Sequence, residues 1–455
     1  MATVIPTTLD APPHPNAKPL LLLALLFLLL GVVLGFNHLL PLYLAQTYSL
    51  HPEELVPGQR AYWAVGLLLA LPAGWLVAQL GYARSLAGAL LILAVGILLL
   101  GAAASGWGLA LSVGGLALVG AGSALLQVAA LPYAAGLEPE RRAAVRLTLL
   151  GAAQALGSTL LPLLGNLLLA ESAGAGKPGV TQLGPYLGLA LALLVGAGLA
   201  LVLAGRPHQP PLPAANPVAA SPEAGTVPAS AFGFRHLQLG ALAVFAGAGV
   251  QAGVSAFFVF YAQSLHLTNL SAFTIARLRE LNAGLNFVLA ATGQATERPL
   301  DTAGGLTIAV AAALLGLHGL GLLVGRLAGV PLLLLVPGRT VLAVTSAAGA
   351  ALVVAALLSS GDAALWLLVA TGLASALVWP VVVSLALTGL GRAAPLGAGL
   401  LVLASLGGVA VVPLMGWLAA HGGWKAAFGV PVVGYLYLLY YALRGSRQPT
   451  LIQGA

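Results

Sequence analysis

A few polar side chains interrupt the long apolar runs of this chain, and their types decide what chemistry it could do. They are Asn37, His38, Gln127, Gln154, Gln251 and Arg326. Burying a polar group without a partner costs roughly 2 to 7 kcal/mol, so each of them needs a hydrogen-bonding neighbour or a function. An amide supplies donors and an acceptor, and a histidine can change its charge near neutral pH.

Each of these groups has two interpretations. The amides and His38 could form hydrogen bonds between packed helices, or they could face a bound solute. Arg326 is expected near the cytoplasmic end of its segment, in a structural role or paired with carbonyl groups, because an isolated arginine at mid-bilayer is costly. Trp379, which precedes Pro380, could stack on a ring of the solute or pack between helices. His318 is interpreted as a packing residue.

Other chemistries find no support in the sequence. It contains no HExxH, no DxxD pair, no Walker-type glycine loop and no nucleophile elbow. Cysteine is absent, and nearly all of the 11 acidic residues fall outside the apolar runs. We therefore expect no enzyme, no cofactor and no bound metal. The net charge of +7 is attributed to cytoplasmic loops of a membrane protein, and nucleic acid is not expected as a partner.

The composition is that of a chain surrounded by lipid. Charged residues make up 6% of the 455 residues and hydrophobic ones 60%, and the mean hydropathy is +1.02. About a quarter of an ordinary soluble chain is charged. The sequence therefore predicts a polytopic membrane protein whose partner is the lipid bilayer, and its 59 glycines favour close helix packing there.

Twelve apolar segments have the length that a membrane crossing needs, roughly 20 residues. They are Pro19–Leu44, Tyr62–Leu80, Leu86–Ala104, Leu109–Leu131, Leu147–Leu169, Leu187–Ala204, Leu239–Gln263, Leu306–Leu335, Val341–Leu358, Ala364–Leu387, Leu396–Ala419 and Phe428–Leu443. A stretch rich in proline, alanine and serine separates the sixth from the seventh and reads as an extended linker.

This pattern predicts an all-α membrane protein with two six-helix bundles. The expected order is a cytoplasmic tail at 1–18, a bundle at 19–204, a cytoplasmic linker at 205–235, a bundle at 236–444 and a second tail at 445–455. If the N-terminus is cytoplasmic, that side receives 11 of the 18 Lys and Arg residues and the other side 6, with Arg326 inside the membrane. The bias places both termini in the cytoplasm.

One insertion, at 264–305, fits neither a span nor a simple loop. Its centre holds Arg277, Arg279 and Glu280 beside a short apolar run. We expect an amphipathic helix that lies along the periplasmic membrane surface. A thirteenth span, which would have to bury all three charges, is the alternative.

Several stretches in this order resemble a known family. GWLVAQLGYAR at 74–84 is similar to the signature between the second and third helices of the major facilitator superfamily, although Ala78 stands where that signature usually has an aspartate. The chain also contains GSALLQVAALPYAAGL at 122–137, RLTLLGAAQALGSTLLPLLG at 146–165, VGRLAG at 324–329 and WPVVVSLALTGLGR from 379. With the similar stretches at 183–193 and 239–261, these segments resemble the fucose–galactose–glucose symporter family.

The resemblance implies a set of site residues. Sugar-binding groups would be Asn37, Gln127, Gln154, Gln251 and Trp379, and gating or structural groups would be Gly81, Arg84, Arg146 and Arg326. The family's two coupling carboxylates correspond to His38 and Gln127 here. A glutamine cannot carry a proton, so we expect weak or absent proton coupling, with His38 as the remaining candidate carrier.

The expected function is that of a secondary transporter in a bacterial inner membrane. By resemblance it would move a hexose or 6-deoxyhexose, bound at the midplane between two rocking halves, with protons or another ion as coupling partner and as a monomer. The alternatives are an uncoupled facilitator, an exporter of another small polar solute, and a sugar sensor that does not transport. A sensor would need a sizeable soluble output domain, and the sequence contains none.

Overall fold

The computed structural model describes residues 17–48, 56–137, 142–173, 183–204, 233–280 and 308–447. The regular structure in these ranges is helical throughout. By length and composition, ten helical stretches here could each cross a membrane, and the last of them, from Gly391 to Gly445, is long enough for more than one crossing. The predicted all-helical fold with twelve spans is confirmed.

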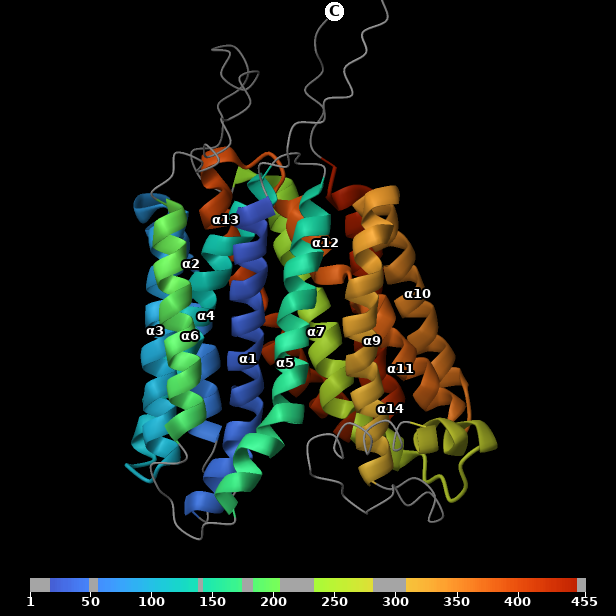
Figure 1. The fold of residues 1–455 in the computed structure, drawn as a ribbon. Helices are drawn as coiled ribbons and strands as arrows, with labels where there is room; N and C mark the ends of the chain where they lie inside the picture. Colours follow the sequence, from blue (N-terminus) through green and yellow to red (C-terminus); the bar gives the residue numbers. More distant parts are fainter. Residues whose placement is uncertain are drawn as a thin grey trace, which may run out of the picture.

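The first half contains six helices in chain order. They are α1 (Ala17–Tyr48), α2 (Val56–Leu80), α3 (Tyr82–Ala104), α4 (Ala110–Gly136), α5 (Ala143–Ala173) and α6 (Leu183–Ala204). In this half α4 packs against α2 and α3, α6 packs against α3, and α1 pairs with α5 (Figure 1).

The second half also gives six crossings, but two of them are interrupted. It contains α7 (Arg235–Ser264), α9 (Ile308–Leu335), α10 (Gly338–Leu358), α11 (Ala363–Ser375), α12 (Val378–Leu387), α13 (Ala394–Ala404) and α14 (Gly407–Tyr440). The segments α11 and α12 share one crossing. The helix α14 bends sharply at Gly423, whose φ is +76°, so it completes the crossing begun by α13 and starts the last one.

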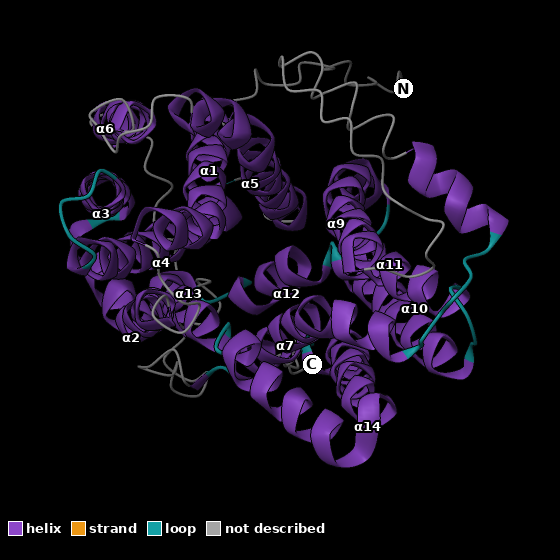
Figure 2. Ribbon diagram, turned by 90° about the horizontal axis from the view of Figure 1, so that it is seen from below, coloured by secondary structure: helices purple, strands orange, loops and turns teal. Residues whose placement is uncertain are grey.

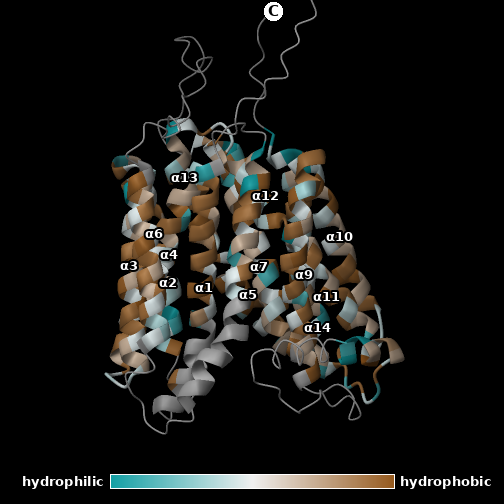
Figure 3. Ribbon diagram, viewed as in Figure 1, coloured by the Kyte–Doolittle hydropathy of each residue, from teal (hydrophilic) through white to brown (hydrophobic). Residues whose placement is uncertain are grey.

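The outer surface of the bundle is apolar where a bilayer would surround it. Leu21, Leu68 and Leu335 are 72%, 74% and 85% exposed. Apolar colouring covers the middle of the helices, and the hydrophilic residues gather towards their ends (Figure 3). Exposed leucine in this amount would be unfavourable in water, and in hydrocarbon it costs nothing.

Glycine allows α1 and α5 to pack closely in the first half. A Cβ atom at Gly31 of α1 would lie 2.0 Å from the carbonyl oxygen of Gln154, and one at Gly157 of α5 would lie 2.2 Å from that of Leu28. Any larger residue at either position would force the two backbones apart. This is the packing that small residues provide when no hydrophobic effect drives helices together.

Gly81 and Arg146, assigned gating or structural roles from the sequence, both shape helix ends in the structure. Gly81 begins α3 with a φ of +80°, and its N–H donates to the carbonyl of Val77 at 2.9 Å. The buried Arg146 donates from Nε to the carbonyl of Ala134 at 2.6 Å and from Nη2 to that of Ala135 at 2.9 Å. It thereby caps the last carbonyls of α4. The side chain of Arg84 is exposed.

The insertion after α7 is described as far as residue 280. A short helix at 272–280 lies across the end of the bundle away from the C-terminus (Figure 1). Both the N–H and the hydroxyl of Ser271 donate to the carboxylate of Asp362, at 2.8 and 2.6 Å, and the indole of Trp366 donates to Thr274. Residues 281–305 lie outside the described part, so the choice between surface helix and extra span stays a prediction.

The negative charge of Asp362 holds the start of the helix at 272–280 against the bundle. Burial raises the pKa of its carboxyl group, but hydrogen bonds from Ser271 and Thr274 lower it by more, and the pKa ends below its usual value. The carboxylate therefore stays ionised at neutral pH and keeps accepting both bonds from Ser271.

The two halves meet closely at the end of the molecule where the C-terminus lies. There α13 packs against α2 and α4 of the first half, which is also visible from below (Figure 2). A Cβ atom at Gly399 would lie 2.6 Å from the carbonyl of Ala70, and one at Gly74 would lie 2.8 Å from that of Pro395. These contacts between backbones close this end of the interface.

The first prediction tests this closure. Gly399→Leu should push α13 away from α2 by about 2 Å, the range over which side-chain size changes helix separation. Because the chain has no native cysteine, spin labels at exposed positions, introduced by Arg142→Cys and Arg392→Cys, can report the distance between the halves. Gly88→Leu is the control, since nothing lies within 4 Å of a Cβ there. An unchanged label distance in Gly399→Leu would contradict the proposed contact.

Candidate functional site

A cavity of about 320 Å³ lies at mid-depth between the two halves. This volume is at the lower end of the range typical of small-molecule sites. Its walls come from both halves and combine apolar side chains with a smaller polar set. The polar and aromatic lining residues are Tyr62, Trp63, Ser123, Gln127, Gln154, Gln251, Arg326, Ser375, Trp379, Ser405 and Tyr435.

Two of the membrane crossings are interrupted at the point where they line the cavity. The break between α11 and α12 brings Ser375 and Trp379 to the wall, and the break between α13 and α14 brings Ser405 there. A helix can be interrupted at membrane depth only where the freed backbone groups are buried in protein or face a polar cavity. Binding sites of secondary transporters are often built from such discontinuous helices.

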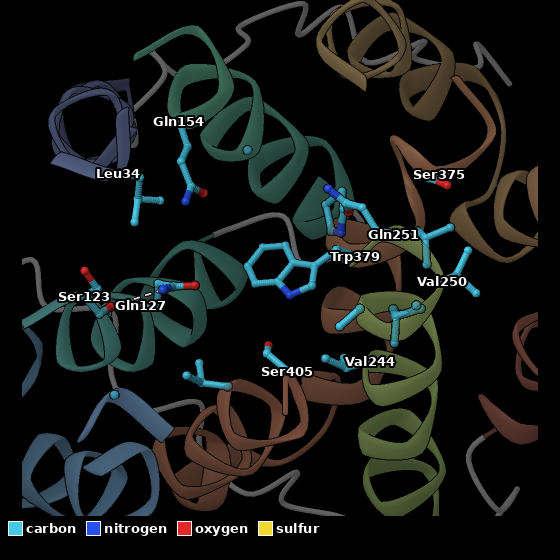
Figure 4. A pocket seen from close by; sticks show the side chains of 18 of the residues that line it. Leu34, Ser123, Gln127, Gln154, Val244, Val250, Gln251, Ser375, Trp379 and Ser405 are labelled. Carbon is cyan, nitrogen blue, oxygen red and sulfur yellow. Dashed lines mark hydrogen bonds between the residues drawn. The ribbon is translucent and has the colours of Figure 1, made fainter. Parts of the chain in front are cut away.

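Three amides surround the cavity from three helices. Gln127 comes from α4, Gln154 from α5 and Gln251 from α7 (Figure 4). Gln127 donates from Nε2 to the carbonyl of Ser123 at 3.2 Å, which leaves its amide oxygen available. Gln154 and Gln251 have no hydrogen-bond partner among the described residues. The cavity therefore presents unused donors and acceptors to whatever enters it.

An aromatic ring occupies the middle of this polar set. The indole of Trp379 lies between the side chains of Gln127 and Gln251 (Figure 4). The hydroxyls of two other lining residues, Ser375 and Tyr435, form a hydrogen bond of 2.6 Å. A flat apolar face beside amides suits a ligand that has both C–H surfaces and hydroxyl groups.

Arg326 lies elsewhere than the sequence indicated. We expected it near the cytoplasmic end of its helix, but it lines the central cavity, about 13 Å from the end of α9 at Leu335 at 1.5 Å per residue. Its Nη1 donates to the carbonyl of Gly151 in the other half at 3.0 Å, which is the expected pairing with a carbonyl. Its buried Nε has no partner among the described residues.

Asn37 and His38 differ from the other predicted site residues. Asn37 is buried and accepts a hydrogen bond from Nε2 of Gln59 at 3.0 Å, which joins α1 to α2. It is not among the residues that line the cavity. This geometry favours the helix-bridging interpretation of Asn37. The side chain of His38 lies outside the described residues.

Sequence reasoning missed several hydroxyl groups of the site. Ser123, Ser375, Ser405 and the phenols of Tyr62 and Tyr435 all line the cavity. A serine in an apolar helix usually bonds a carbonyl of its own helix, so its presence gives no signal of function. Ser123 is an exception, because its buried hydroxyl bonds no carbonyl of its own helix and interacts instead with the phenol of Tyr62.

The comparisons with known proteins agree with this architecture. The "Glucose/galactose transporter" of Brucella abortus biovar 1 (strain 9-941) is 31% identical, and the match covers 98% of this chain and 100% of that one. This chain belongs to the fucose–galactose–glucose family of the major facilitator superfamily. A scan against protein-family models finds no match.

Solved structures show the same fold. The major facilitator transporter FucP, in the outward conformation, is 22% identical over 95% of this chain and 100% of that one, with a TM-score of 0.77. A second structure of FucP, named there as the fucose:proton symporter of Escherichia coli, gives a TM-score of 0.76. The proton:xylose symporter XylE is 14% identical, with a TM-score of 0.63.

The second prediction tests the amides. Gln127→Leu and Gln251→Leu should each weaken binding of a sugar ligand by about tenfold, the loss expected when a buried hydrogen bond is removed. Affinity would be measured on purified protein with the monosaccharide that raises the melting temperature most in a screen. Gln263→Leu, at an exposed position near the end of α7, is the matched control. Unchanged affinity in both cavity variants would exclude these two residues from the site.

Proposed function

We propose that this chain moves a monosaccharide across the membrane by alternating access through the central cavity. The observation that carries the proposal is the cavity itself, which both halves line with free amides around an indole ring. The family membership adds to it, since the Brucella relative is named for glucose and galactose.

The geometry accounts for binding in simple terms. The C–H face of a pyranose would stack on Trp379, and its hydroxyls would exchange hydrogen bonds with Gln127 on one side and Gln251 on the other. These two amides belong to different halves, so a bound sugar would connect the halves. Binding of the sugar would therefore act on both bundles at once.

The close contact of α2 with α13 gives the transport cycle its gate. In the described state the halves touch at the end of the molecule where the C-terminus lies. Rocking of the halves would separate these helices and bring the opposite ends together. The same cavity would then be reached from the other side of the membrane.

Placement in the membrane follows from the charge bias. We propose a bacterial inner membrane, both termini in the cytoplasm, and two bundles at 19–204 and 236–444 that function as a monomer. The end closed by α2 and α13 would then face the cytoplasm, and the attached helix at 272–280 would lie on the periplasmic side.

Coupling to protons is proposed to be weak or absent. No acidic residue is among the described residues that line the cavity. Gln127, at a position where the family carries a carboxylate, has no proton to give. His38 remains the candidate carrier in the first half, because an unperturbed histidine titrates near pH 6.5.

The third prediction tests transport itself. Proteoliposomes that contain the purified protein should take up the best monosaccharide from the screen faster than protein-free liposomes. Uptake should fall by at least about tenfold in Gln127→Leu. A protein that binds the sugar with no uptake above protein-free liposomes would be a sensor on the same scaffold, and the transport proposal would be wrong.

The fourth prediction tests coupling. If transport is uncoupled, uptake should continue to equilibrium, without accumulation, when the pH gradient is collapsed. His38→Ala should then transport at about the wild-type rate. Accumulation that depends on the pH gradient and disappears in His38→Ala would instead assign the proton to His38. Accumulation that persists in His38→Ala would show both the weak coupling and the choice of carrier to be wrong.

A further inference from the structure

The cavity has an unbalanced positive charge. Among the described residues that line it, Arg326 is the only one with a charged side chain. The acidic residues of the whole chain are Asp10, Glu53, Glu54, Glu138, Glu140, Glu171, Glu223, Glu280, Glu297, Asp301 and Asp362. In the sequence all of them fall outside the twelve apolar segments, and none is among the described residues that line the cavity.

Neutral partners do not remove this charge. The hydrogen bond from Nη1 of Arg326 ends on a peptide carbonyl, that of Gly151, which has no net charge. The Nε atom has no partner within the described structure. A buried cation is stabilised well only when an anion and further hydrogen bonds compensate for its lost hydration. The described residues around Arg326 supply the hydrogen bonds in part and no anion.

The unused part of the guanidinium has a defined chemical preference. With Nη1 held by Gly151, the edge formed by Nε and Nη2 is the one left for a ligand. Two parallel N–H donors of this kind match the two oxygens of a carboxylate, and such paired contacts are stronger and more specific than those of a hydroxyl. Because Nε is covered in this state, the fork would engage fully as the halves move.

We propose that the cavity selects monosaccharides that carry a carboxylate, such as uronates, and that Arg326 binds this carboxylate. This inference rests on the proposed function and names its substrate class. The sugar ring would stack on Trp379 between the amides, with its carboxylate directed to the wall where α9 meets α5. The ligand is then the missing counter-ion. The same fixed charge opposes entry of a proton or metal cation, in agreement with weak proton coupling.

The experiment compares sugars that differ in one group. D-Galacturonate and D-galactose, and likewise D-glucuronate and D-glucose, differ at C6, where the uronates carry the carboxylate. Binding to wild-type protein would be measured by thermal shift and calorimetry, and uptake by proteoliposomes. We expect at least one uronate to bind about tenfold or more tightly than its neutral partner.

Variants then assign the preference to one residue. Arg326→Gln should lower the ratio of uronate affinity to neutral-sugar affinity about tenfold or more, while Arg326→Lys should keep part of the preference. Arg392→Gln, which changes an exposed arginine of the same half, should leave the ratio of affinities unchanged.

Each outcome bears on a different claim. Neutral sugars that bind as tightly as their uronates, or a uronate preference that survives Arg326→Gln, would overturn this inference and leave sugar transport standing. If neither class of sugar is bound or carried, the proposed function fails instead. The ratio of uronate affinity to neutral-sugar affinity in the wild-type protein tests the proposal even if Arg326→Gln does not fold. A ratio of one or less is sufficient to reject it.

Discussion

The absence of water from the bilayer is the constraint on which the rest of this structure depends. Hydrocarbon offers no hydrogen bonds, so a spanning chain must satisfy its own backbone, and helices do so within each segment. Hydroxyl side chains follow the same rule: Ser85 donates to the carbonyl of Gly81, and Thr345 to that of Val341. Where helices do break at mid-depth, around Ser375 and Ser405, they break against the central cavity.

The same constraint explains how the bundles are held together. Lipid tails are as apolar as leucine, so close contact between helices has to come from shape. Gly31 and Gly157 bring α1 and α5 together inside one half, whereas Gly74 and Gly399 bring α2 and α13 together across the interface. The first contact keeps a bundle rigid, and the second is a surface that can separate. Rigid halves with a separable interface are what alternating access requires.

The cavity is where polar side chains are concentrated inside the membrane-spanning part. Amides, hydroxyls and one guanidinium line it, and no acid is among its described lining residues. Amides and an indole ring can recognise a sugar without any net charge. Arg326 adds a charge that no described residue neutralises, and this unpaired charge is what separates the site from a general polar pocket.

Local properties of the sequence determined the spans, and the tertiary structure decided the use of the polar residues. Hydropathy depends on neighbours along the chain, which is why the twelve apolar segments, from Pro19 onward, could be placed to within six residues. It is also why Gln127, Gln251 and Trp379 stood out. Contacts between distant segments leave no such local signal. Only the fold showed that Asn37 pairs with Gln59, that Arg326 reaches Gly151 across the interface, and that the crossing at 363–387 is broken at its centre.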